Sequence, residues 1–247
     1  MKTTIVIPTF NEAENLPKLV EAIFKLPMDI NLLVVDDNSP DGTGDIAEKL
    51  KIETKGKVSV LHRKGKLGLG SAYITGFQQA IREGADYIGQ MDADFSHPID
   101  KLPDLIEALN QFDFVLGSRY VKGGSLDENW PFWRKALSGF GNLYARTILG
   151  MKIKDVTGGF RVWRKETLSS MPLERVRSNG YIFQVEMSYV ATRLGFVCKE
   201  IPIHFADRRW GKSKMSFRIQ IEAAFRTWVL LGMYRDLNKK LTLQERK

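Results

Sequence analysis

The feature that most constrains this chain is a regular alternation of short apolar runs with segments of helical periodicity. Apolar runs of strand length occur at residues 4–8, 31–36, 58–62, 87–91 and 112–117. Segments with helical spacing follow at 16–24, after 41–43, at 72–82 and at 101–110. Strands that are apolar throughout and alternate with helices predict an α/β fold, with a mostly parallel central sheet flanked by helices on both faces.

Polar clusters follow these strands at the points where they end. The clusters comprise residues 8–12, 36–39, 92–97 and 117–120. Ligands of open α/β sheets bind beyond the carboxyl ends of the strands. We therefore expect the clusters to meet at one edge of the sheet, around a single site.

Asp92-Ala93-Asp94 is the cluster with the clearest chemistry. It leaves the strand at 87–91, so its two carboxylates can turn towards one point, and Ser96 adds a third oxygen. Mg²⁺ prefers oxygen ligands and often takes one or two carboxylates together with substrate phosphates. The alternative is an acidic turn whose side chains bond only to backbone groups. The other clusters on the same edge favour the ligand site.

The glycine-rich segment 65–70 does not match a dinucleotide-binding fingerprint. Position 73 is Tyr where the last Gly should stand, and the segment follows the third strand, not the first. We expect its glycines to let backbone approach a nucleotide, with Lys64 and Lys66 supplying charge. A solvated turn is the alternative.

The pattern changes beyond residue 120. We expect a helix over 133–149, a strand over 157–163, a helix that opens at 181, and a strand over 197–205 that Pro202 interrupts. One side of the first helix carries Trp133, Leu137, Phe140, Tyr144 and Ile148. Glu186 stands in an apolar run, where it is either solvated or paired with a buried base.

The segment 207–214 is strongly basic. It contains Arg208, Arg209, Lys212 and Lys214 around Trp210. This composition suits a phosphate clamp, because Arg grips phosphate through two hydrogen bonds and Lys acts as a point charge. A generic basic surface loop is the alternative.

Residues 215–234 alternate cations with bulky apolar side chains. Arg218 and Arg226 interrupt the run, so we do not expect it to span a bilayer. It either lies in a membrane interface, with Trp228 and Tyr234 at headgroup depth, or packs on the core of the domain. We therefore divide the chain into a domain at 1–214 and an amphipathic helix with a tail at 215–247.

Composition narrows the classes of partner. The net charge of +8 over 247 residues indicates anionic partners: nucleic acid, phosphorylated small molecules or an acidic membrane. The single Cys198 excludes an internal disulfide framework. No secretory leader pattern and no apolar run of about 18–20 residues is visible, so we expect a cytoplasmic protein that can lie on a membrane.

Six motifs occur in a characteristic order, at residues 8–12, 35–43, 92–98, 117–120, 157–161 and 211–214. Together they resemble those of the dolichol-phosphate (polyprenol-phosphate) mannose synthases, within the family 2 inverting glycosyltransferases. The resemblance covers roughly residues 3–230. The runs at 38–43, 180–187 and 209–214 are more particular to the polyprenol-phosphate branch.

The resemblance implies a GT-A nucleotide-sugar fold and transfer of mannose from GDP-mannose to a polyprenyl (dolichyl) phosphate. It implies a donor site of Pro8, Phe10, Glu12, Val35, Asp36, Asp37, Asp92, Ala93, Asp94 and Arg119. Mg²⁺ or Mn²⁺ would be held by Asp92, Asp94 and Ser96. The acceptor phosphate would be held by Arg119, Arg134, Arg208 and Lys214. Asp92, Asp94, Arg208 and Lys214 would be the catalytic residues.

The residues suit this chemistry. A phosphate monoester is already ionised near pH 7, so the acceptor needs no strong general base. A single in-line displacement would invert the α configuration of the sugar to β. A lipid acceptor also implies peripheral contact with the cytoplasmic face of a membrane, with or without a separate anchoring subunit.

Three other interpretations of the sequence compete with this one. The first keeps the reaction and changes the donor to UDP-glucose or another nucleotide sugar. The second, a sugar-nucleotide nucleotidyltransferase, predicts a glycine-rich basic loop directly after the first strand, and residues 8–12 are not one. The third is a nucleic-acid-binding protein, for which we would expect a continuous stripe of cations. Here the cations are instead scattered among acidic loops at the ends of the strands.

Overall fold

A single open sheet forms the centre of the molecule. The computed structural model describes residues 1–207 and 217–237, with the side chains of 217–223 left aside. Within these residues the sheet has seven strands in the order β3-β2-β1-β4-β7-β5-β8. They are β1 (Thr3–Thr9), β2 (Ile30–Asp36), β3 (Val58–His62), β4 (Tyr87–Gln90), β5 (Phe114–Ser118), β7 (Arg161–Arg164) and β8 (Cys198–Pro202).

The pairing is parallel throughout the sheet except at β7. That strand lies between β4 and β5 and runs antiparallel to both. The other pairs, β1 with β2 and β4, β2 with β3, and β5 with β8, are parallel. The predicted α/β class with a mostly parallel sheet is confirmed.

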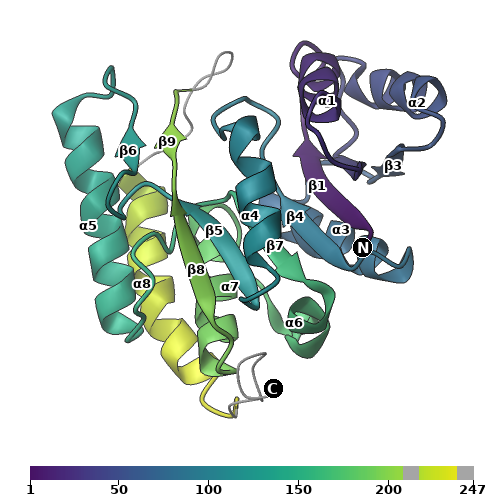
Figure 1. Ribbon diagram of the computed structural model, residues 1–247. Coiled ribbons are helices and arrows are strands. Elements are labelled where there is room, and N and C mark those ends of the chain that lie inside the picture. The colour runs from purple at the N-terminus through teal and green to yellow at the C-terminus, as the bar shows by residue number, and fades with distance from the viewer. Residues whose placement is uncertain (208–216, 238–247) are drawn as a thin grey trace.

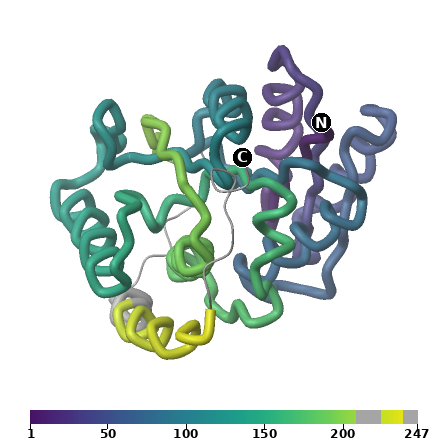
Figure 2. The backbone as a smooth tube through the Cα atoms, turned by 60° about the horizontal axis from the view of Figure 1, so that its bottom comes forward, coloured from purple at the N-terminus to yellow at the C-terminus, as the bar shows by residue number. Residues whose placement is uncertain are grey.

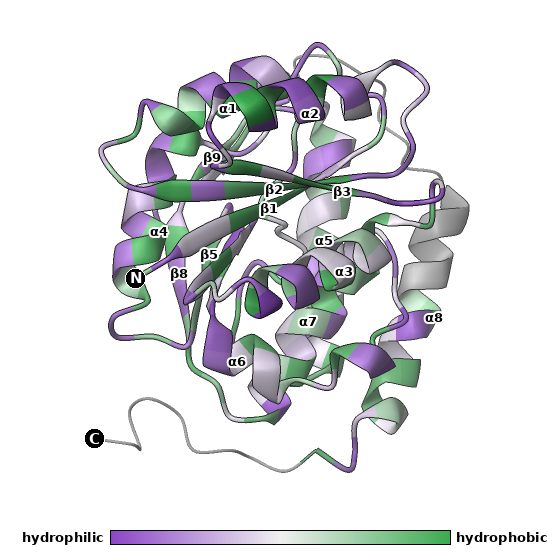
Figure 3. Ribbon diagram, turned by 90° about the vertical axis from the view of Figure 1, so that its right-hand side faces the viewer, coloured by the Kyte–Doolittle hydropathy of each residue, from purple (hydrophilic) through white to green (hydrophobic). Residues whose placement is uncertain are grey.

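Helices cover both faces of the sheet (Figure 3). One face carries α1 (Leu16–Phe24), α2 (Thr43–Glu53) and α4 (Leu102–Ala108), the last preceded by the 3-10 turn Ile99–Lys101. The other carries α3 (Leu69–Arg82), α5 (Phe132–Ile148), α6 (Lys165–Ser170), α7 (Tyr181–Arg193) and α8 (Phe217–Met233). A separate pair of short parallel strands joins β6 (Ser125–Leu126) to β9 (His204–Phe205).

The two-sided cover explains why the strands are apolar throughout. Successive side chains of a strand point to opposite faces. Ile5 and Ile7 accordingly pack with α1 and α4, while Val6 packs with α3 on the other face. Each strand therefore presents buried positions on both faces.

Helix α3 approaches β1 unusually closely. A Cβ atom at Gly76 would lie 2.3 Å from Cγ1 of Val6, well inside van der Waals contact. Glycine at this position lets the helix backbone rest on the strand. The same contact sets the first turn of α3, at Leu69, beside the carboxyl edge of the sheet.

Helices α5 and α8 lie side by side at one end of the molecule (Figures 1 and 2). Trp228 of α8 donates a hydrogen bond to the Tyr144 hydroxyl of α5, at 2.8 Å. On its inner side α8 contributes Leu230 to the core, and Tyr234 follows it there. On its outer side Phe225 and Trp228 are exposed. No helix in the described part of the chain is long and apolar enough to cross a membrane.

Three predictions about local structure need correction. The strand expected over 157–163 begins only at Arg161, because the Arg161 guanidinium bonds to the carbonyls of Val156 and Gly158 and folds the preceding residues into a loop. Helix α3 begins at Leu69, three residues before the expected start. Glu186 is neither solvated nor paired with a base: it is fully buried and accepts from Ser178 N–H and the Tyr234 hydroxyl.

Candidate active site

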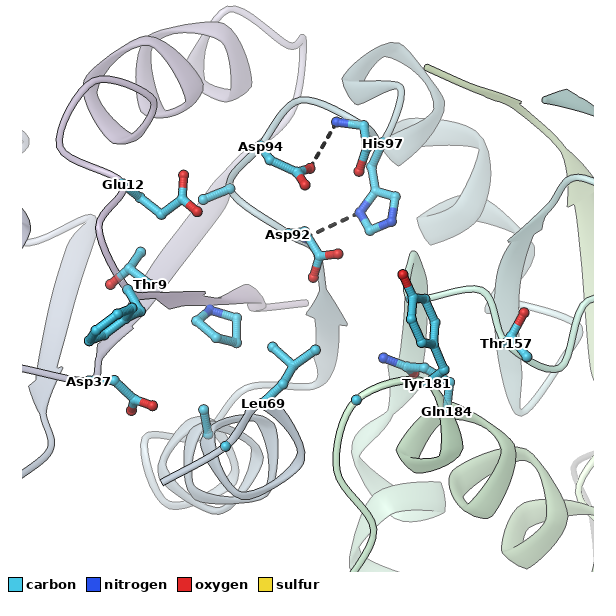
Figure 4. A pocket seen from close by; sticks show the side chains of 18 of the residues that line it. Thr9, Glu12, Asp37, Leu69, Asp92, Asp94, His97, Thr157, Tyr181 and Gln184 are labelled. Carbon is cyan, nitrogen blue, oxygen red and sulfur yellow. Dashed lines mark hydrogen bonds between the residues drawn. The ribbon is translucent and has the colours of Figure 1, made fainter. Parts of the chain in front are cut away.

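The polar clusters that follow β1, β2, β4 and β5 meet in one cavity of about 360 Å³ at the carboxyl edge of the sheet. Figure 4 shows Glu12 and Asp37 on one side and Thr157, Tyr181 and Gln184 on the other, with Asp92 and Asp94 between them. Of the predicted site residues, the cavity is lined by Pro8, Phe10, Glu12, Asp37, Asp92, Ala93, Asp94, Ser96 and Arg119. The sheet edge thus brings together residues up to 111 positions apart.

Hydrogen bonds at the carboxyl ends of β1 and β2 build the first wall of the cavity. The Thr9 hydroxyl donates to Asp36 Oδ1 at 2.9 Å, and the Ser39 hydroxyl donates to the same oxygen at 2.6 Å. Asp36 is 2% exposed and does not line the cavity. Val35 is fully buried in the core. These two predicted donor residues therefore support the wall from behind.

Asp37 and Phe10 form the cavity side of this wall. Arg63 Nη1 lies 3.0 Å from Asp37 Oδ1, and the Leu67 N–H donates to Oδ2 at 3.3 Å. Burial raises the pKa of Asp37, and the nearby charge of Arg63 opposes that rise only in part. Lys66 Nζ lies 4.1 Å from the centre of the Phe10 ring. An aromatic ring beside a carboxylate is a suitable surface for a nucleoside.

The turn after β4 carries the two central carboxylates. The Tyr73 hydroxyl, fully buried in α3, donates to Asp92 Oδ1 at 2.8 Å. The Asp92 N–H donates to His97 Nδ1 at 3.2 Å, so the ring proton of neutral His97 is on Nε2. Asp94 Oδ1 accepts from the Ser96 N–H at 3.1 Å. These bonds fix a tight turn in which Phe95 takes a φ of 61°.

The oxygen atoms of this turn fit a hard divalent cation. The Ser96 Oγ is buried without a hydrogen-bond partner in the described structure. No group of three or more His, Cys, Asp or Glu side chains within residues 1–207 and 217–237 forms a complete metal site. Two carboxylates and a hydroxyl would leave the remaining positions to substrate and water, which is how Mg²⁺ sites are commonly built.

Arg119, after β5, is held rigidly by the loop before β7. Its Nε and Nη2 donate to the two oxygens of Asp155, each at 2.7 Å. Burial opposes ionisation of Asp155, but the charge of Arg119 and its hydrogen bonds outweigh burial and hold the pKa of this carboxyl below its usual range. A bidentate ion pair of this kind fixes the plane of the guanidinium.

Of the other cations predicted to hold the acceptor phosphate, the structure describes only Arg134. Arg134 of α5 does not line the cavity: its guanidinium lies 3.6 Å from the Trp130 ring centre and 3.5 Å from Asp207 Oδ1. Arg208 and Lys214 lie outside the described residues, as does the predicted domain boundary at 214. Their roles remain predictions.

Several cavity residues escaped prediction. Thr157, Tyr181 and Gln184 line the far wall, and Gln184 accepts a 2.7 Å bond from the Gln90 amide of β4. Thr157 belongs to the motif at 157–161 that resembles the family, but the sequence assigned no role to its side chain. Tyr181 and Gln184 belong to the run 180–187, which resembles the polyprenol-phosphate branch, but the apolar spacing of that run indicated core and neither residue was given a role. Tyr73 does not line the cavity but bonds to Asp92 from behind. Apart from the glycines near it, nothing in the sequence pointed to this role.

Comparison with known proteins agrees with the geometry. The sequence pattern described as glycosyl transferase family 2 matches residues 4–171. The polyprenol monophosphomannose synthase of Mycolicibacterium smegmatis is 42% identical over 234 residues, covering 94% of this chain and 88% of that protein. The undecaprenyl-phosphate mannosyltransferase of Micrococcus luteus is 43% identical over 245 residues, covering 98% and 100%.

A solved structure shows the same fold at much lower sequence identity. The mannosyltransferase PcManGT from Pyrobaculum calidifontis, in complex with GDP-Man and Mn²⁺, is 16% identical with a TM-score of 0.61, covering 92% of this chain and 64% of that one. It supports the GT-A architecture. With a family pattern over residues 4–171 and relatives above 40% identity along nearly the whole length, this chain belongs to glycosyl transferase family 2.

Proposed function

We propose that this protein transfers mannose from GDP-mannose to a polyprenyl phosphate, with inversion, giving a polyprenyl-phosphate β-mannose and GDP. The names of the two relatives support both the sugar and the acceptor. The observation that carries the proposal is the meeting of Asp92 and Asp94 with Arg119 in one cavity. A carboxylate pair and a guanidinium on one site suit the binding of two phosphorylated substrates.

The nucleoside end of the donor fits the wall made by Phe10, Glu12 and Asp37. The Phe10 ring offers a face to a base, and the carboxylates can accept hydrogen bonds from base N–H or ribose hydroxyl groups. The diphosphate would then reach the turn at Asp92-Ala93-Asp94. This order places the sugar towards Gln184 and Arg119.

A divalent cation fits at Asp92, Asp94 and Ser96, as Mn²⁺ in the structure of PcManGT also suggests. Such an ion would neutralise the charge that develops on the departing diphosphate. The choice between Mg²⁺ and Mn²⁺ is part of the test below. The chain's own part is to hold these oxygen atoms in place through Tyr73 and the backbone of the turn.

The reaction needs no strong base. An oxygen of the acceptor phosphate, ionised near pH 7, attacks the anomeric carbon, and the bond from that carbon to the diphosphate oxygen breaks. GDP leaves with the electron pair, and attack from the opposite side inverts the sugar. Arg119, with the predicted Arg208 and Lys214, would position the acceptor and offset repulsion between the two anions.

The lipid acceptor calls for contact with a membrane, and α5 and α8 present a surface for it. We define the aromatic face as Phe132, Trp133, Phe140 and Leu143 of α5 with Phe225, Trp228 and Val229 of α8, all of which are exposed. Helix α5 also carries Arg134, Lys135 and Arg146 and no acidic residue. Exposed aromatic residues beside cations suit the interface of an anionic bilayer.

These features support peripheral contact with a bilayer, with the aromatic face in the headgroup region, and we propose that this contact is on the cytoplasmic face of the membrane. A separate anchoring subunit is compatible with this arrangement. The sequence left two alternatives for residues 215–234, membrane contact or packing on the core. On this proposal, each applies to one side of α8. Its buried side packs on the core and its exposed side remains for the bilayer.

Radiolabelled mannose transfer from GDP-mannose to undecaprenyl phosphate tests the proposal. We expect label in the lipid phase with Mg²⁺ or Mn²⁺, no label with EDTA, and a loss of about a hundredfold or more in Asp94→Asn, since removal of a metal ligand takes away charge stabilisation worth several kcal/mol. The exposed Asp104, paired with Lys101, offers a matched control in Asp104→Asn.

Two other outcomes would change the conclusion. Transfer from UDP-glucose but not from GDP-mannose would keep the fold and the mechanism and replace the donor. Absence of transfer from any nucleotide sugar, by protein that still binds GDP, would refute the proposed reaction.

A further inference from the structure

The hydroxyl of Thr157 is surrounded by groups that can only donate hydrogen bonds to it. Asn142 Nδ2 of α5 lies 2.9 Å from Thr157 Oγ1, and Arg119 Nη2 lies 2.8 Å from the same oxygen. Neither nitrogen has a lone pair with which to accept. Both contacts therefore use acceptor positions of the threonine oxygen.

The orientation of the Asn142 amide is fixed independently. The Thr157 N–H donates to Asn142 Oδ1 at 3.1 Å, which identifies that atom as the oxygen. Nδ2 also donates to the Ser138 carbonyl at 3.1 Å. Asn142 is 2% exposed, and the partners at both ends of its amide agree on this one orientation.

A hydroxyl has two acceptor positions and one hydrogen. With both acceptor positions of Thr157 occupied, its hydrogen is left to donate, and the described residues provide no acceptor for it. Thr157 lines the cavity beside Arg119. Nη2 of Arg119 is already committed to Asp155 and Thr157, so its Nη1 is the end available to a ligand.

The charged group in direct contact with Thr157 is the Arg119 guanidinium, which can attract an anion. Asp155 is fully buried between two buried guanidinium groups, those of Arg119 and Arg161. Arg161 donates to the carbonyls of Val156, Gly158 and Gln184, and no carboxylate of the described residues bonds to it directly. Asp155 thus lies between two cations, and the half-buried Glu200, whose charge also acts on Arg161, accepts from the N–H groups of Lys154 and Asp155.

We propose that Thr157 donates a hydrogen bond to an oxygen of the acceptor phosphate, alongside Arg119, and that Asn142 of α5 fixes its direction. This inference rests on the proposed function for the identity of the acceptor. The acceptor is favoured over the donor diphosphate because Thr157 lies on the wall opposite Asp37 and Glu12 (Figure 4). Thr157 is also hydrogen-bonded to Asn142 of α5, the helix that carries much of the aromatic face.

Binding of farnesyl phosphate, a short isoprenyl monophosphate, tests the contact without turnover. The Thr157→Val variant keeps the shape of the side chain and loses the hydroxyl. We expect its affinity for farnesyl phosphate to fall about tenfold or more, because a hydrogen bond to a charged group has roughly this effect. Thr157→Ser should stay within about threefold of wild type, and GDP affinity should not change in either variant.

A second variant tests whether the direction of the Thr157 hydroxyl matters, while the hydroxyl itself stays in place. Asn142→Asp replaces the donor Nδ2 by an acceptor, so the Thr157 hydrogen turns towards the new carboxylate. We expect the same loss of farnesyl phosphate binding with the hydroxyl still present. Thr167→Val removes a buried hydroxyl that donates to the Asp113 carbonyl, away from the cavity, and serves as the control.

Unchanged farnesyl phosphate affinity in Thr157→Val would overturn the inference, and so would an equal loss of GDP affinity, which would assign the hydroxyl to the donor. The proposed function is judged separately. If wild-type protein binds farnesyl phosphate through Thr157 but transfers no mannose, the inference about phosphate recognition stands and the proposed reaction fails.

Discussion

The hydroxyl of Tyr73 determines how Asp92 meets the cavity. Its ring is enclosed between Phe77 and Phe183, with ring centres 5.8 Å away on each side. The phenol therefore has a fixed position, and it occupies one oxygen of Asp92. The other oxygen has no partner among the described residues and is left for a ligand.

We predict that Tyr73→Phe weakens Mn²⁺ binding in the presence of GDP about tenfold, because groups that orient a metal ligand commonly contribute 10- to 100-fold to affinity. Electron paramagnetic resonance of free Mn²⁺ would measure it. Tyr87→Phe is the matched control, since Tyr87 is buried and its hydroxyl lies 3.3 Å from Asn110 Oδ1, away from Asp92. Identical Mn²⁺ titrations for wild type and Tyr73→Phe would show that the hydroxyl does not orient Asp92.

At the scale of elements, α5 combines two tasks on opposite sides. Its inner side carries Asn142, which holds the Thr157 loop at the cavity. Its outer side carries Trp133 and Phe140, 65% and 64% exposed. A helix that packed both sides on the core would leave no aromatic side chain so exposed. The same rigid element thus connects the proposed bilayer surface with the proposed phosphate contact.

We predict that the double variant Phe140→Ser, Leu143→Ser reduces partitioning onto vesicles with anionic lipid by roughly tenfold, because each side chain gains about 1 kcal/mol or more when its apolar area leaves water. Cosedimentation with phosphatidylcholine vesicles containing phosphatidylglycerol would measure this. Ile52→Ser changes an apolar residue on α2 that is even more exposed, at 78%, and should have no effect. Equal losses in both variants would indicate nonspecific adsorption.

At the scale of the whole molecule, the buried charges around Asp155 connect distant parts of the sheet. They join Arg119, after β5, to Arg161, at the start of β7, through the loop between α5 and β7. Breaking a buried ion pair by removal of one partner costs about 3–5 kcal/mol. These residues therefore matter to folding as well as to the cavity.

The pH dependence of unfolding follows from the lowered pKa of Asp155. In the unfolded chain this carboxyl titrates near ~3.9. Its stabilising contribution is therefore complete above that pH and is lost as the pH falls through the lower pKa of the folded state. We predict that Asp155→Asn lowers the free energy of unfolding by about 3–5 kcal/mol at pH 7, with the difference shrinking below a pH of about 4.

Urea denaturation at several pH values would measure this difference. The control is Asp104→Asn, an exposed partner of Lys101, for which we expect at most about 1 kcal/mol. A difference between wild type and Asp155→Asn that stays constant down to pH 3 would mean that the charge of Asp155 does not contribute in the way proposed.

Prediction from sequence succeeded where local pattern and chain topology carry the information. Residues 31–36 and 87–91 are apolar on both faces, and this pattern follows directly from a covered parallel sheet. The acids after those strands were expected at one edge for the same topological reason. Val35 and Asp36, which the resemblance assigns to the donor site, do not line the cavity, because sequence position shows that a residue lies near an edge but not which way its side chain turns.

The sequence by itself determined the α/β class, the edge at which the site lies, the Asp92 and Asp94 pair and the family. All of these depend on periodicity or on contiguous motifs. Only the tertiary structure decided the antiparallel insertion of β7, the bond from Tyr73 to Asp92, the donor-only environment of Thr157 and the exposure of Phe140. Each depends on contacts between residues far apart in the chain, such as Gln90 with Gln184. Such contacts depend on which particular side chains meet in the folded chain, and neither periodicity nor a contiguous motif specifies that.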